Sequence, residues 1–162
     1  MLSSLPDAAK RRRSDRGQAL VETAFILFLL LFLILSIFDF SVLFYVYLSL
    51  EQGISEATRY QVTGQQLPDP NKAGNFLSRD DSVKMTMRGW NPLITLNDSA
   101  FTFEHLNGTT WIAGSGGPND ISRVTVNYNW RLLTPLVSPI FTGGQAALRV
   151  SSTMKNEGYP SP

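Results

Sequence analysis

The longest unbroken pattern in the sequence is an apolar run near its amino-terminal end. Residues 23–38 are 16 consecutive uncharged positions, 13 of them Phe, Ile or Leu, and Asp39 is the next charge. Inserting such a run into a bilayer gains about 4 to 8 kcal/mol, more than the ~3 kcal/mol that one carboxylate costs at the bilayer centre. A cleavable secretory signal would be followed by an A-x-A-like site, which is absent here. A buried core helix would need a larger apolar partner than the polar remainder of the chain supplies. We therefore expect a membrane anchor.

The helical pattern continues beyond the apolar run. No proline or glycine interrupts residues 18–52, and Gly64 is a plausible stop. A helix over residues 18–63 would be about 69 Å long, against a hydrocarbon core of about 30 Å. Roughly half of it must then project from the membrane. The alternative is a spanning helix and a separate surface helix, broken near Asp39.

The projecting half has an amphipathic pattern. Leu50, Ile54 and Ala57 share one face, and polar residues occupy the other. After a connection rich in proline, glycine and asparagine, the apolar period changes from 3.6 to 2. Strands with one apolar face predict an antiparallel sheet covered on one side, and the Leu50, Ile54 and Ala57 stripe is the nearest available cover. The predicted strands are residues 82–88, 101–104, 124–131 and 148–154.

The sequence therefore predicts an α+β fold in three parts: a basic leader over residues 1–17, a long helix over 18–63, and a sheet domain over 64–162. Within the sheet domain, Asp80 and Asp81 are expected in a turn. Pro135 and Pro139 remove backbone donors, so their apolar segment is expected to be a crossover or an edge segment rather than a central strand.

Charge suggests how the chain is oriented in a membrane. Residues 1–17 carry five Lys and Arg against two Asp, a local charge of +3. By the positive-inside rule this leader is cytoplasmic and the carboxyl-terminal part lies across the membrane. Asp39 is then expected to mark the outer interface, with contact to another helix in an assembly as the alternative.

Composition excludes several kinds of protein. The whole chain has 14 Lys and Arg against 13 Asp and Glu, a net charge of +1, which is too balanced for a nucleic-acid partner. It has no cysteine, and its one histidine, His105, makes a metal site or a Ser-His-Asp triad improbable. No motif groups its acids and serines as a catalytic pocket requires. We expect no enzyme, metal or cofactor, and a lipid bilayer as partner.

A specific motif joins the leader to the apolar helix. Residues 16–22, RGQALVE, resemble the type IV prepilin signal, in which a glycine ends a basic leader and a glutamate follows five residues later. The resemblance implies that a prepilin peptidase on the cytoplasmic side cuts after Gly17 and makes Gln18 the new amino terminus. It also implies that Glu22 pairs with the terminal amine of a neighbouring subunit.

The longer sequence RGQALVETAFILFLL, continuing into EQGISEATRY, is similar to TadE-like minor pseudopilins of the tight-adherence (Tad/Flp) pilus system. Residues 130–141 and 148–157 resemble the carboxyl-terminal part of that family. The resemblance implies a pilin-like fold and a structural or assembly role in a Tad/Flp type IV pilus or related secretion machinery. Implied partners are the prepilin peptidase, other pilins and pseudopilins, and an inner-membrane assembly platform. The implied location is the bacterial inner membrane, with the sheet domain periplasmic or extracellular.

Two other functions compete with this one. The first is an extracytoplasmic binding protein held by an ordinary signal anchor that the prepilin peptidase does not process. The second is a membrane-tethered hydrolase, for which the sequence offers many serines and acids but no motif that brings them together.

Overall fold

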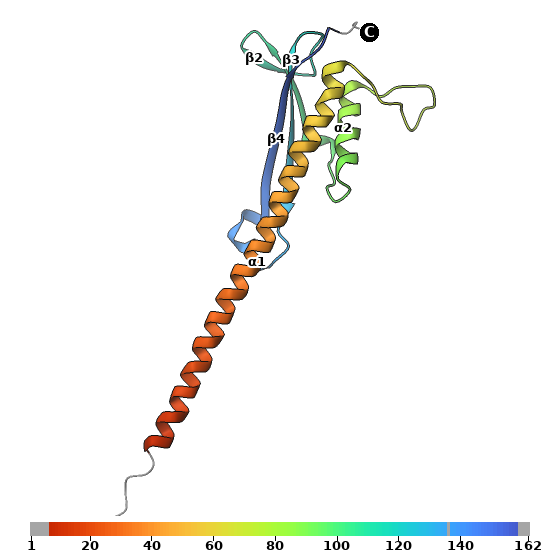
Figure 1. Cartoon of the computed structure of the whole chain (residues 1–162). Coiled ribbons are helices and arrows are strands. Elements are labelled where there is room, and N and C mark those ends of the chain that lie inside the picture. Colours follow the sequence, from red (N-terminus) through yellow and green to blue (C-terminus); the bar gives the residue numbers. More distant parts are fainter. Residues whose placement is uncertain (1–6, 136, 159–162) are drawn as a thin grey trace, which may run out of the picture.

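The computed structural model describes residues 7–135 and 137–158, with side chains described from Gly17 on. Its main feature is one long helix, α1 (Asp7–Thr63), whose carboxyl-terminal half carries a small domain (Figure 1). The helix runs past Asp39 as a single element, so the alternative of two helices broken there is wrong. It ends where the sequence predicts, and Gly64 follows with a φ of +68°, a conformation that glycine adopts without strain.

The start of α1 differs from the prediction. The helix begins at Asp7, within the predicted leader, rather than at Gln18. Residues 8–13, AAKRRR, are all strong helix formers, which explains why the helical backbone extends into the leader. Residues 1–6 of the leader lie outside the described residues, and so do the side chains of its basic cluster.

Within the described residues, four antiparallel strands form one sheet in the order β2-β1-β3-β4. The two long strands pair along their whole length, from Ile121 opposite Lys155 to Arg131 opposite Gln145. Strands β1, β3 and β4 include the predicted segments, whereas the short β2 was not predicted. The α+β fold class is confirmed. The bounds are β1 (Phe101–Asn107), β2 (Thr110–Ala113), β3 (Ile121–Arg131) and β4 (Gln145–Lys155).

The prediction of a strand over residues 82–88 is wrong. This segment belongs to a second helix, α2 (Arg79–Trp90), which packs beside α1. Val83 and Met87 are buried one turn apart, and Met85 between them is exposed, so the same apolar residues satisfy a helix as well as a strand. Ser78 Oγ accepts the Asp81 N–H at 3.1 Å and caps the helix. Asp80 and Asp81 lie in its first turn, where negative charge is favourable, and not in a loop.

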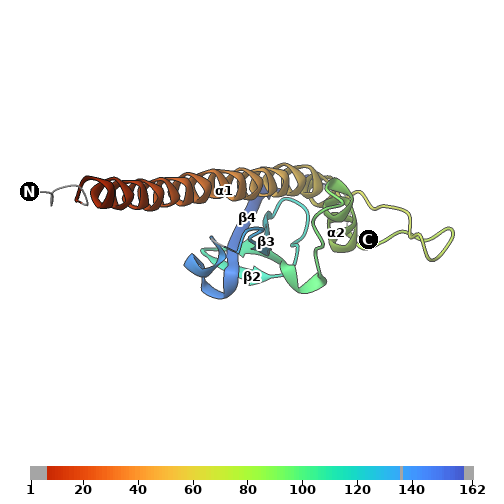
Figure 2. The same ribbon diagram turned by 90° about the horizontal axis from the view of Figure 1, so that it is seen from below.

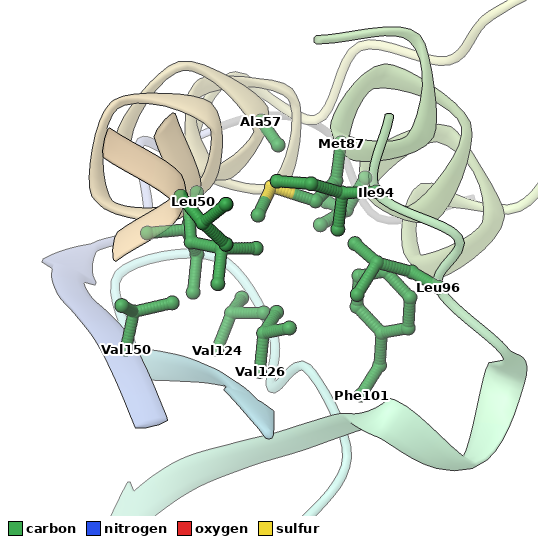
Figure 3. Packing of buried hydrophobic residues seen from close by; sticks show 12 residues of the cluster. Leu50, Ala57, Met87, Ile94, Leu96, Phe101, Val124, Val126 and Val150 are labelled. Carbon is green, nitrogen blue, oxygen red and sulfur yellow. The ribbon is translucent and has the colours of Figure 1, made fainter. Parts of the chain in front are cut away.

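The sheet lies on one side of α1, next to α2 (Figure 2). The hydrophobic core fills the space between the sheet and both helices (Figure 3). Leu50, Ile54 and Ala57 are 1%, 2% and 0% exposed, and they line the side of α1 that faces the domain. Because α2 also enters the core, α1 covers the sheet together with a second helix, rather than alone as the sequence predicts. Other residues of this core are Val83, Met87, Ile94, Leu96, Phe101, Val124, Val126 and Val150.

The connection between β3 and β4 reaches back toward the amino-terminal half of α1 (Figure 1). It contains two short 3-10 turns, η2 (Ser138–Ile140) and η3 (Thr142–Gly144). Pro139 lies in the first turn, and Gly143 and Gly144 adopt positive φ values in the second. The segment with the two prolines is therefore a connection between antiparallel neighbours and contributes no strand.

Candidate membrane and assembly site

The amino-terminal half of α1 exposes its apolar side chains. Leu20, Leu27 and Phe38 are 72%, 62% and 57% exposed, and the domain lies beside the other half of the helix (Figure 1). Residues 17–63 contain an 18-residue window with a mean hydropathy of 2.8, almost none of it buried in the protein. The helix is long and apolar enough to cross a bilayer. It is thus compatible with a single-pass membrane anchor.

The residues predicted for processing and pairing lie at the start of this apolar surface. Gly17, Gln18 and Glu22 are all exposed. A Cβ atom built on Gly17 would meet no other atom within 4 Å. Gln18 Nε2 donates a hydrogen bond of 3.0 Å to Glu22 Oε1, one helical turn away. The structure therefore brings Gln18 and Glu22 together on an open surface, where the Glu22 carboxylate is available as an acceptor.

Asp39 binds a distant segment of its own chain. Its side chain is 1% exposed. The Leu133 N–H donates to Oδ1 at 3.1 Å and the Thr134 N–H donates to Oδ2 at 3.2 Å. The Thr134 hydroxyl donates to the same Oδ2. The carboxylate thus fixes the β3–β4 connection to α1, and buried charge of this kind needs such donors.

The location of Asp39 at the outer membrane interface stays a prediction. The sequence did not predict this internal contact, which takes the place of the alternative contact to another helix. A signal was nevertheless present. Asp39 precedes Val46 by seven residues and Leu50 by eleven, which are two and three helical turns. All three are buried on the domain side of α1. A charge in line with a buried apolar stripe indicates a specific internal partner.

The predicted site residues fall into two separate groups. Glu22 and the packing residue Leu50 are 28 positions apart, which corresponds to about 42 Å along a helix. The first group is exposed on the free half of α1, and the second, Leu50, Ile54 and Ala57, is buried against the domain. Asp39 lies between them.

The amino-terminal part of the chain matches a known family. Residues 17–59 fit the family model described as TadE-like protein. This segment is similar to the TadE-like family. The match begins at Gly17, includes Glu22 and Asp39, and ends in the packed half of α1, so the resemblance is confirmed for the TadE-like helix. It links the chain to the Tad pilus system and to partners within that system.

Beyond the TadE-like helix the comparisons give no support. The match stops at residue 59, so the resemblance of residues 130–141 and 148–157 stays a prediction. The chain has no match among curated proteins or among solved structures.

The carboxyl-terminal end nevertheless has a definite structural role. Asn156 is 2% exposed, and its Nδ2 donates to the carbonyls of Ser115 and Gly117 at 3.2 and 2.8 Å. The Glu157 N–H donates to the carbonyl of Val62 at 2.8 Å. The end of β4 is thereby tied to the loop before β3 and to the last turn of α1.

His105 lies in strand β1, beside the residue that follows strand β2. Its Nδ1 atom lies 3.1 Å from the carbonyl oxygen of Gly114. Among the described side chains, no three His, Cys, Asp or Glu residues come close enough together to hold a metal ion.

Proposed function

We propose that this protein is a minor pseudopilin, a structural or assembly component of a Tad/Flp type IV pilus or related secretion machinery. The observation that carries this proposal is the extent of the TadE-like match, from Gly17 through the exposed apolar half of α1 into the packed half. One continuous helix can then anchor the chain in lipid and hold the domain outside. The role is architectural and needs no catalysis.

We further propose the orientation that the positive-inside rule favours. The basic leader remains in the cytoplasm, and the domain lies on the far side of a bacterial inner membrane. Partners are the prepilin peptidase, other pilins and pseudopilins, and the inner-membrane assembly platform. In this arrangement Gly17 is at the cytoplasmic boundary, where the peptidase acts.

Processing after Gly17 requires the helix to unwind locally, because Gly17 lies within the helical backbone of α1. The position is open, and the missing side chain lets an extended backbone enter a narrow protease site. Cleavage removes five basic and two acidic residues and leaves 9 basic against 11 acidic, a formal charge of −2. An acidic shift of the isoelectric point should therefore accompany the loss of the leader.

Amino-terminal sequencing of protein recovered from membranes tests the processing. With a prepilin peptidase the terminus should be Gln18, and without it Met1. The Gly17→Ala variant should be cut and Gly17→Leu should not, because only leucine adds bulk beyond Cβ. Normal maturation of Gly17→Leu would show that the site is wrong. Full-length protein under both conditions would favour the unprocessed, signal-anchored binding protein.

The proposed assembly contact is between Glu22 and the terminal amine of a neighbouring subunit. Neither charge is stable alone at a hydrocarbon boundary, so pairing offsets part of the desolvation and fixes the register of the helices. Glu22→Ala should insert normally, because the apolar run is unchanged, and should fail to enter the assembled pilus complex. Glu56→Ala on the outer face of the packed half is the matched control and should assemble. Equal recovery of both variants in the complex would show that Glu22 has no pairing role.

A further inference from the structure

The β3–β4 connection lies at a defined height on α1. Asp39 fixes it there through Leu133 and Thr134. Gln18 and Asp39 are 21 residues apart, or about 32 Å along a helix, and the hydrocarbon core is about 30 Å thick. With Gln18 at one boundary of the membrane, Asp39 and the connection bound to it are at the other.

The surface of this connection is uncharged and carries large exposed apolar side chains. We define the interfacial loop as residues 132–135 and 137–144. Leu133 and Ile140 are 56% and 68% exposed. The sequence has no charged residue between Arg131 and Arg149, and both of these arginines are exposed. An uncharged loop with exposed apolar side chains and an arginine at its border has the composition of a segment that contacts a lipid surface.

The loop is continuous with the apolar surface of the helix. The rings of Phe40 and Phe141 lie 6.2 Å apart. Beside them is an open apolar groove of about 670 Å³, lined by α1 residues from Leu33 to Tyr47 and by Leu148. The exposed apolar surface therefore passes from the membrane-crossing part of α1 to the domain without a polar interruption at Asp39, whose charge is turned inward and hydrogen-bonded.

We propose that the interfacial loop is a second membrane contact, in which Leu133, Ile140 and Phe141 enter the outer interfacial region of the bilayer. Arg131, at the start of the loop, then lies at the level of the lipid phosphates. The occupant of this surface is lipid, because the loop is fixed at the height where the apolar helix leaves the hydrocarbon core. Helix and loop together hold the domain at one depth and one tilt, which a single spanning helix leaves variable.

The absence of cysteine allows a direct test with single labels. The full chain is reconstituted in phosphatidylcholine and phosphatidylglycerol vesicles and carries one environment-sensitive fluorophore on Ile140→Cys or Leu133→Cys. Lipids brominated high in the acyl chains, or near the chain ends, act as depth-dependent quenchers. Ile112→Cys is the matched control, because Ile112 is also an exposed isoleucine and its strand β2 is at the far end of the domain (Figure 1).

The Ile140 and Leu133 probes should be quenched several-fold more than the Ile112 probe, and more by the high bromines than by those near the chain ends. Quenching of the Ile140 and Leu133 probes no greater than that of the Ile112 probe would overturn the proposal. The proposal would also be overturned by fluorescence that changes with the protein-to-lipid ratio and is not quenched by the brominated lipids. That result would show that a second copy of the chain covers the loop.

This inference rests on the membrane anchor of the proposed function and not on pilus assembly. A probe on Leu31→Cys, in the middle of the apolar run, reports the anchor separately. Deep quenching at Leu31 without quenching at Ile140 refutes only the loop contact. No quenching at Leu31 refutes the anchor and the loop contact together.

Discussion

Replacing Asp39 with alanine should release the β3–β4 connection while α1 stays helical. The substitution removes an acceptor for two backbone N–H groups and one hydroxyl. Hydrogen bonds to a charged group contribute about 1.5–3 kcal/mol each, and water replaces part of this because the loop is partly exposed. We expect the free energy of local opening to fall by about 2–4 kcal/mol, which increases the open population about 30-fold to 900-fold.

Hydrogen exchange of the Leu133 and Thr134 amides measures this opening in the full chain, in detergent or in lipid discs. In Asp39→Ala both amides should exchange about 30-fold to 900-fold faster than in the wild type. Ser41→Ala is the control, since the Ser41 hydroxyl donates only to the Ile37 carbonyl within the same helix. Its effect on the two amides should be small. Unchanged exchange in Asp39→Ala would show that the carboxylate does not hold the connection, and the fixed height of the interfacial loop would lose its basis.

Two further predictions concern the domain. Ile54→Asp places a carboxylate in the core at a cost of several kcal/mol and should make the domain protease-sensitive, whereas Arg59→Asp, on the exposed face, should not; equal resistance of the two variants would contradict the packing. The pKa of Asp81 lies below its usual value of 3.8, because Ser78 and Lys84 hydrogen-bond to its carboxylate. The difference in unfolding free energy between wild type and Asp81→Asn should thus be constant from neutral pH down to the usual value of 3.8 and should shrink below it. Thermal unfolding at each pH measures this difference. A difference that persists at the lowest pH would contradict the assignment.

Several parts of the fold follow from local patterns alone. The apolar run of residues 23–38 predicts the exposed half of α1, because the transfer of Phe, Ile and Leu into lipid depends on composition and hardly on context. The helix end at Thr63 follows from Gly64. The two-residue period of β3 and β4 survives in the structure, since one side of each long strand faces the core.

The segment around α2 shows where a local pattern is ambiguous. Val83, Met85 and Met87 alternate as in a strand, yet Val83 and Met87 are also one helical turn apart. Three apolar residues are too few to distinguish the two periods. The pair Ser78 and Asp81 was the better indicator. A serine whose side chain accepts the backbone N–H three residues later is typical of the start of a helix.

The sequence by itself determined a membrane-competent helix, a covered antiparallel sheet and the Gly17 to Glu22 motif, because each depends on residues close together in the chain. The role of Asp39 was decided only by the tertiary structure. Its donors Leu133 and Thr134 are 94 and 95 residues away. A local hydrophobic pattern does not predict which distant backbone groups will hydrogen-bond to a buried carboxylate. The same contact sets the height of the interfacial loop on α1, so this feature arises from the packing of the domain against its own helix.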